Sequence, residues 1–184
     1  MILATPRERP DVCCLPATFT AVVVHDGLLA GFRAKEALRW LNHVLGPQSN
    51  VRFFSWSFDQ LDRADMRAKA LKAAALAQMI IVAGGEDAPV PPHVEGWLNA
   101  CASDARARGA VIVALPDDES LCQFGGHEPR FVHTIRRLAA RWHADFMSGA
   151  EFDQRAAPDL VKQRFLPASA ALPLQRYTSP WLEA

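Results

Sequence analysis

Residues 79–85 read Met-Ile-Ile-Val-Ala-Gly-Gly, and the first five form the most apolar short run of the chain. Two glycines bound this run, as is common where a strand passes into a loop. A strand that is apolar at every position is typical of a parallel sheet covered on both faces, whereas a half-buried strand alternates apolar and polar residues. We therefore predict a central, buried strand over 79–83.

Strand-like and helix-like patterns alternate on both sides of this run. A β-branched run over 19–24 stops at the turn-forming residues 25–27, and from Ala34 onward Leu38, Leu41 and Leu45 recur at helical spacing. Further strands are predicted over 51–56, 111–115 and 144–148, and further helices over 62–77, 93–108 and 128–143. Asp62 is the predicted N-cap of the helix over 62–77, and Gly109 is predicted to end the helix over 93–108.

This alternation predicts one α/β domain with a parallel sheet, because each parallel return needs a crossover of a dozen residues or more. Five strands suit the order 2-1-3-4-5 of a three-layer, doubly wound sheet. A chain of 184 residues, 50% of them apolar, is long enough for one such core. We expect a leader over 1–18, the α/β domain over 19–149 and an extended arm over 150–184, with Phe165, Leu172, Leu174, Tyr177 and Trp181 as anchors.

Composition argues against several classes of function. Twenty Lys and Arg balance twenty Asp and Glu, so no overall field favours nucleic acid or an anionic membrane. No apolar run is long enough to span a bilayer, and residues 1–10 lack a secretory apolar stretch. The four cysteines show no CxxC spacing, and Cys101 lies on an apolar helix face as a small hydrophobe would. We predict a cytoplasmic protein without a disulfide framework or a zinc site.

In an open parallel sheet, a ligand binds beyond the carboxyl ends of the strands, where the strand order reverses. In this chain that position is formed by three predicted loops, 25–33, 84–92 and 116–129. Backbone N–H groups at the start of the first helix, near Ala30, Gly31, Phe32 and Arg33, are placed to hold an anion.

The segment Gly-Gly-Glu-Asp-Ala-Pro over 84–89, followed by a helix that contains Trp97, is similar to the flavin-flanking loop of flavodoxins and diflavin reductases. The resemblance to the flavodoxin-like family covers about residues 19–148. It implies an FMN-binding or nucleotide-phosphate-binding crevice and an electron-transfer role. Together with the start of the first helix, it gives the candidate crevice residues Ala30, Gly31, Phe32, Arg33, Gly84, Gly85, Glu86, Asp87 and Phe124.

Two departures from the flavodoxin pattern argue against a flavin. The segment over 28–32 reads Leu-Leu-Ala-Gly-Phe and lacks the hydroxyls that donate to the FMN phosphate in flavodoxins. The loop over 84–92 has no aromatic residue to stack on the flavin, which leaves only Phe124. The chain is more similar to bacterial proteins that keep a flavodoxin-like fold without a recognised cofactor site. We predict no cofactor, and we expect Leu28, Leu29 and Phe32 to fill the crevice.

Other polar residues have ordinary explanations beside functional ones. His25 and Asp26 form either an acid/base couple or a turn at a strand end. The acidic pair 86–87 and the triplet 117–119 either bind a hard cation or are solvated loops, and the basic residues Arg67, Lys69 and Lys72 form either a binding surface or a solvated helix face. In each case the ordinary explanation is the prediction.

Known catalytic patterns do not fit. A response-regulator receiver shares the topology. In a receiver the third strand ends in an aspartate and a lysine follows the fifth strand, and neither residue is present at the corresponding position of this chain. There is no Gly-x-Ser-x-Gly elbow and no Walker A loop. We therefore predict no catalytic residue and no metal site. The leading hypothesis is a non-catalytic binding or regulatory module that acts through a protein partner or as a homo-oligomer. The alternatives are the FMN or nucleotide-phosphate binder and a degenerate receiver-like module.

Overall fold

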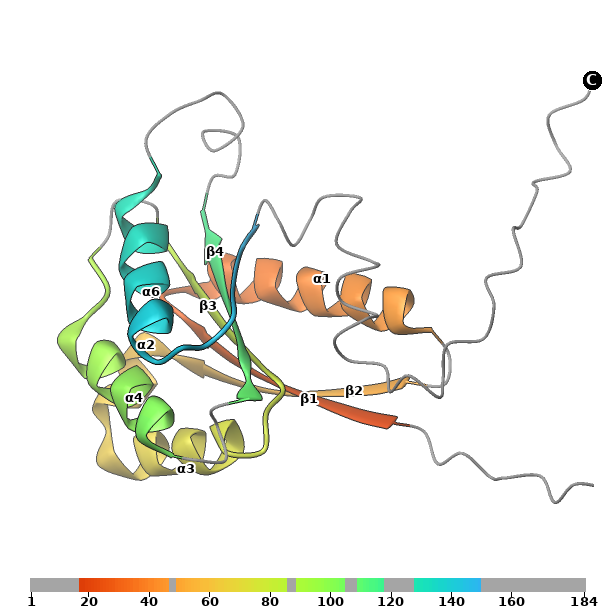
Figure 1. Cartoon of the computed structure of the whole chain (residues 1–184), viewed down its shortest axis with the longest axis horizontal. Helices are drawn as coiled ribbons and strands as arrows, with labels where there is room; N and C mark the ends of the chain where they lie inside the picture. The colour runs from red at the N-terminus through yellow and green to blue at the C-terminus, as the bar shows by residue number, and fades with distance from the viewer. Residues whose placement is uncertain (1–16, 47–48, 86–88, 105–108, 118–127, 150–184) are drawn as a thin grey trace, which may run out of the picture.

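The computed structural model of the chain describes residues 17–46, 49–85, 89–104, 109–117 and 128–149. Five parallel strands form one sheet in the order β2-β1-β3-β4-β5 (Figure 1). This confirms the predicted α/β fold and its flavodoxin-like topology. The strands are β1 (Ala17–His25), β2 (Ser49–Ser57), β3 (Met79–Gly84), β4 (Val111–Pro116) and β5 (Phe146–Ser148).

Strand β3 is central, as its apolar run predicts. It pairs with β1 on one side and with β4 on the other, and all six of its residues are buried. Ile80 and Val82 pack into the core on one face of the sheet, whereas Met79 and Ile81 pack into the core on the opposite face. The sheet therefore separates two apolar clusters.

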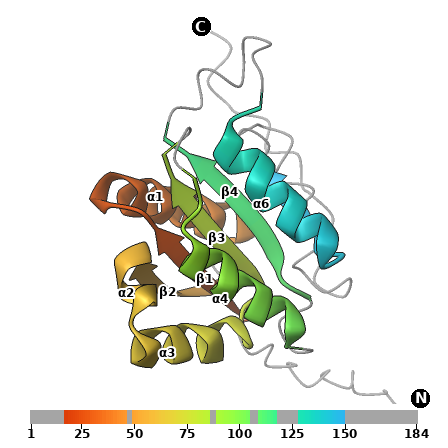
Figure 2. The same cartoon turned by 90° about the vertical axis from the view of Figure 1, so that its left-hand side faces the viewer.

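The described helices divide between the two faces of the sheet (Figure 2). Helix α1 (Leu28–Leu45) covers one face with Leu38, Leu41 and Leu45, as predicted. Trp97 and Phe131 are the largest fully buried side chains of the opposite cluster. That opposite face is covered by α2 (Phe58–Asp62), α3 (Ala64–Ala74), α4 (Pro92–Ser103) and α6 (Arg130–Arg141).

Two helix starts differ from the predictions. Helix α1 begins at Leu28, so most of the loop predicted over 25–33 is its first turns. Helix α2 begins at Phe58, where a connecting loop was expected, and its N-cap is Ser57 instead of Asp62. The Ser57 side chain accepts from the Gln60 N–H while the Gln60 side chain accepts from the Ser57 N–H, a reciprocal pair that starts a helix strongly.

Three further boundaries are corrected. Arg63 has extended backbone angles (φ −75°, ψ 125°), which separate α2 from α3, so the helix predicted over 62–77 corresponds to α3 and begins at Ala64. Helix α4 ends at Ser103 with Asp104 as its C-cap, so Gly109 does not close it. Strand β1 already begins at Ala17, within the predicted leader. The rest of that leader and the predicted arm over 150–184 lie outside the described residues. No helix in the described segments is both long and apolar enough to cross a bilayer.

Candidate functional site

The carboxyl ends of β1, β3 and β4 meet at one edge of the sheet, which we call the carboxyl edge. His25 is in register with Ala83, and Gly84 with Pro116. Because α1 begins three residues after His25, its first turns lie at the same edge. Of the residues proposed for the crevice, Ala30, Gly31, Phe32, Arg33, Gly84 and Gly85 are at this edge, whereas Glu86, Asp87 and Phe124 lie outside the described residues.

Asp26 joins the ends of β1 and β3. Its backbone N–H donates to the carbonyl of Ala83 at 3.1 Å, and its carboxylate Oδ2 accepts the backbone N–H of Gly85 at 2.7 Å. A phosphate bound at this position would need that same N–H group and would meet the negative charge of the carboxylate. The contact therefore works against anion binding at the turn after β3.

Arg33 joins α1 to the end of β4. Its Nη1 donates to the carbonyl of Pro116 at 2.7 Å, and its Nη2 forms an ion pair with the carboxylate of Asp117. The Arg33 side chain is 33% exposed, so this bridge lies partly within the protein. Both terminal nitrogens of the guanidinium are thus used within the chain, and a ligand phosphate would have to compete for them.

Two glycines of the proposed crevice accommodate the protein's own rings. A Cβ on Gly31 would lie 3.2 Å from Cε1 of His25, and a Cβ on Gly84 would lie 2.9 Å from Cε2 of Phe131. The glycines thus allow backbone and ring to approach closely. Within the described residues no hydrogen bond joins His25 to Asp26, and the buried Nδ1 of His25 has no partner. The acid/base couple considered from the sequence is not formed.

Leu28, Leu29 and Phe32 project into solvent, so the expectation that they fill the crevice is wrong. Their exposed fractions are 80%, 79% and 62%. The inward positions of these turns belong to Ala30 and Ala34, which are buried, so helical periodicity directs the larger side chains outward. Residues three or four apart are neighbours on a helix surface, so the three side chains form one surface, the apolar patch. The sequence signal for this patch was the group of large apolar residues at 28, 29 and 32, which were expected to fill the crevice.

A groove of about 360 Å³ between α3 and α4 was not anticipated from the sequence. His93 Nε2 lies 2.9 Å from the carbonyl oxygen of Phe58, and Arg67 Nη1 lies 3.4 Å from that of Leu61. Both polar side chains of the groove therefore contact α2. Lys69 and Lys72 are exposed, as predicted for a solvated basic face, whereas Arg67 is half-buried. The groove is lined by Ala64, Arg67, Ala68, Leu71, His93, Gly96, Trp97 and Ala100.

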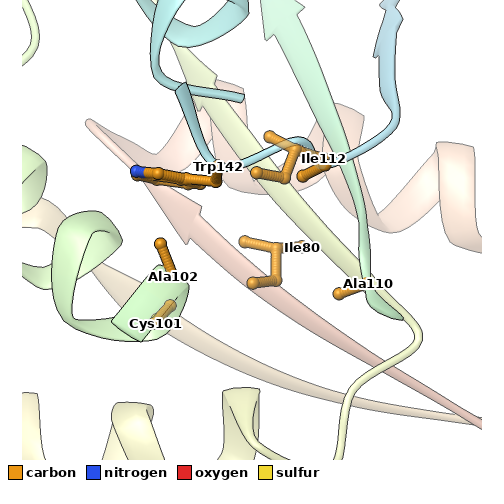
Figure 3. Close-up of a pocket in the computed structure, with 7 residues that line it drawn as sticks. Ile80, Cys101, Ala102, Ala110, Ile112 and Trp142 are labelled. Carbon is orange, nitrogen blue, oxygen red and sulfur yellow. The ribbon is translucent and has the colours of Figure 1, made fainter. Parts of the chain in front are cut away.

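The Cys101 thiol is buried, in accordance with an apolar role. It lines a cavity of about 10 Å³, and Figure 3 shows the labelled side chains around it. Such a space holds a single water molecule at most, and no organic ligand. Burial, with a smaller contribution from the charge of Asp104, raises the pKa of Cys101 to about 12. The thiol therefore stays protonated at neutral pH and is not an activated nucleophile.

The described part of the chain contains no group of three or more His, Cys, Asp or Glu side chains arranged to hold a metal ion. Asp117, the one described residue of the acidic triplet, pairs with Arg33. The fold and this edge define an α/β protein of flavodoxin-like topology in which the Gly85 N–H and the Arg33 guanidinium are bonded within the chain. No protein-family model matches the chain, and no curated protein matches it.

Proposed function

We propose that this protein is a non-catalytic binding module of the cytoplasm that acts through a protein partner or a second copy, with the apolar patch as its contact surface. The observation that carries the proposal is the exposure of Leu28, Leu29 and Phe32 at the edge where related topologies hold their ligands. Clustered large apolar side chains in contact with water are typical of interaction sites.

The surroundings of the apolar patch suit a rigid contact surface. Helix α1 is anchored by buried Ala30, Ala34 and Leu38 directly beneath it. The bridge from Arg33 to Pro116 and Asp117 attaches the same turns to β4. A surface that is already ordered loses little conformational entropy on binding, which favours affinity.

A photoreactive benzoylphenylalanine at position 32 tests the proposal in cells that express the full chain. We expect a discrete covalent adduct, reduced several-fold by Leu28→Ser with Leu29→Ser. The matched control is the same photoreactive residue at Leu76, which is 69% exposed and precedes β3 at the other end of the sheet. Equal adducts at positions 32 and 76, or none at 32, would contradict the proposal.

The second candidate is an FMN or nucleotide-phosphate binder, supported by the flavodoxin-like topology alone. The contacts of Asp26 and Arg33 count against it, because the Gly85 N–H and the Arg33 guanidinium are already bonded within the chain and a phosphate would have to displace those bonds. We expect the purified protein to be colourless at 450 nm and its Tm to be unchanged by saturating FMN. A yellow protein, or a clear rise in Tm with FMN, would favour the second candidate over the first.

A further inference from the structure

Strand β2 is at one lateral edge of the sheet and is nine residues long, Ser49–Ser57. It pairs with β1 along one side over its full length. Within the described residues, no strand pairs with its other side. An edge strand of this length presents a row of N–H and C=O groups that another strand can bind.

The side chains of β2 do not protect this edge in the usual way. Phe53 is 44% exposed and Phe54 is 47% exposed, and because neighbours on a strand point to opposite faces, there is an exposed aromatic on each face. Phe54 stacks on the half-buried Trp56 with ring centroids 6.2 Å apart. Arg52 is the only charged residue of the strand. The described edge of β2 thus has backbone groups that another strand can pair with, and exposed aromatic side chains on both of its faces.

We propose that β2 pairs antiparallel with β2 of a second copy of this chain, forming a two-fold dimer with one continuous sheet. In an antiparallel pair, residues directly opposite each other point to the same face of the sheet. A two-fold axis between two successive residues would pair residues that point to opposite faces. The axis must therefore pass through one position of the strand, and the residue at that position lies opposite its own copy. The middle residue of Ser49–Ser57 is Phe53. This register places Phe53 opposite Phe53 of the second copy.

The sequence of β2 is complementary to itself in this register. Arg52 faces Phe54 of the second copy, within the distance at which a guanidinium interacts with an aromatic ring, and no two like charges meet. Val51 faces Ser55, and Asn50 faces Trp56. A parallel, in-register pair would place Arg52 against Arg52 instead, which disfavours it. Arg52, the one charge of the strand, therefore favours the antiparallel orientation for a second copy of this chain.

This inference does not depend on the apolar patch, so the two proposals can fail separately. We expect the full chain to be a dimer by size-exclusion chromatography with light scattering. Phe53→Lys or Phe53→Glu alone should raise the dimer dissociation constant by about tenfold or more, because each variant places a charge against itself and removes an aromatic pair. An equimolar mixture of the two variants should dimerise again, since Lys then faces Glu.

The matched control is Leu76→Lys, the same charge introduced at another exposed apolar side chain, which should leave the dimer intact. Phe53→Cys should form an intermolecular disulfide in mild oxidant, because opposite residues of an antiparallel pair lie within disulfide range. A monomeric wild-type chain, a dimer lost in Leu76→Lys but kept in Phe53→Lys, or a mixture of the Lys and Glu variants that stays monomeric would overturn the proposal.

Discussion

At the scale of single residues, glycines and short polar contacts determine the shape of the carboxyl edge. Gly84 lies where β3 ends, and the ring of Phe131 from α6 occupies the space that a Cβ would need. Asp26 holds the next residue, Gly85, through its N–H. The backbone at the end of β3 therefore packs against the Phe131 ring of α6 and is hydrogen-bonded to the carboxylate of Asp26.

Gly84→Ala should destabilise the protein by about 1–3 kcal/mol, because the added Cβ forces the fully buried Phe131 ring to move within a close-packed core. Urea unfolding followed by circular dichroism measures this change. Gly96→Ala is the matched control, since Gly96 lies within α4 and a Cβ there meets nothing within 4 Å. We expect that control to be neutral or to stabilise by up to about 1 kcal/mol. Equal losses in both variants would contradict the argument.

The raised pKa of Cys101 predicts a dependence of stability on alkaline pH. The pKa of the folded state is about 12, above the ordinary value of 9.0, so the unfolded state loses its proton first as the pH rises. Stability is therefore fully present below pH 9.0 and is lost between pH 9.0 and about 12, by at most about 1.4 kcal/mol per pH unit.

Cys101→Val removes this titration and keeps an apolar side chain. We expect the free energy of unfolding of wild type, relative to Cys101→Val, to be constant from pH 7 to pH 8 and to fall at pH 10. The other cysteines are common to both proteins and cancel in the difference. Parallel curves for the two proteins across pH 9 to 10 would show that Cys101 does not titrate as argued.

At the scale of elements, the start of α2 depends on local side-chain bonds. Ser57 and Gln60 exchange hydrogen bonds across the first turn. Ser57→Ala should cost about 1 kcal/mol, and adding Gln60→Ala should cost less than the sum of the two single changes, because both bonds belong to one motif. Asp62→Ala is the control and should be within about 0.5 kcal/mol of wild type. A cost for Asp62→Ala as large as that for Ser57→Ala would contradict the assignment of the N-cap.

The strand order and the buried helix faces were predictable because each depends on a repeating pattern. The run over 79–83 and the leucines of α1 carry that pattern clearly. The start of α1 was missed because Leu28, Leu29 and Phe32 place apolar residues on the solvent side of the helix, against the expected period. The separation of α2 from α3 was missed because Arg63 is not a residue that ordinarily ends a helix.

The candidate site was predictable only in its location. Topology alone places Gly31 and Gly84 at one edge. The partners that occupy this edge come from distant parts of the chain: Phe131 from α6 beside Gly84, and Asp117 after β4 beside Arg33. No local pattern encodes such contacts, because they depend on which side chains meet across the folded sheet.

At the scale of the whole molecule, two apolar cores share one sheet. Leu38 of α1 belongs to one core and Leu98 of α4 to the other. Because the strands between them contribute side chains to both cores, loss of either core removes the support of the sheet. The described domain should therefore unfold as one cooperative unit.

Leu38→Ala and Leu98→Ala should each destabilise the protein by about 2–5 kcal/mol, since both side chains are buried. The double variant should equal the sum within about 0.5 kcal/mol, because the sheet separates the two sites. Far-ultraviolet circular dichroism and tryptophan fluorescence should give coincident transitions in each variant. Two separate transitions would mean that the cores are independent.

The position of β1 between β2 and β3 has a consequence for synthesis on the ribosome. β1 pairs with β2 over nine positions and with β3 over five. Residues 17–57, which contain β1, α1 and β2, are translated before β3. The edge of β1 that pairs with β3 therefore stays unpaired until β3 has emerged from the ribosome. An unpaired apolar strand edge in a nascent chain is prone to association with other chains. Pairing of the run over 79–83 with β1 covers this exposed strand edge. Silent codon changes that slow translation between β2 and β3 should therefore lower the soluble yield.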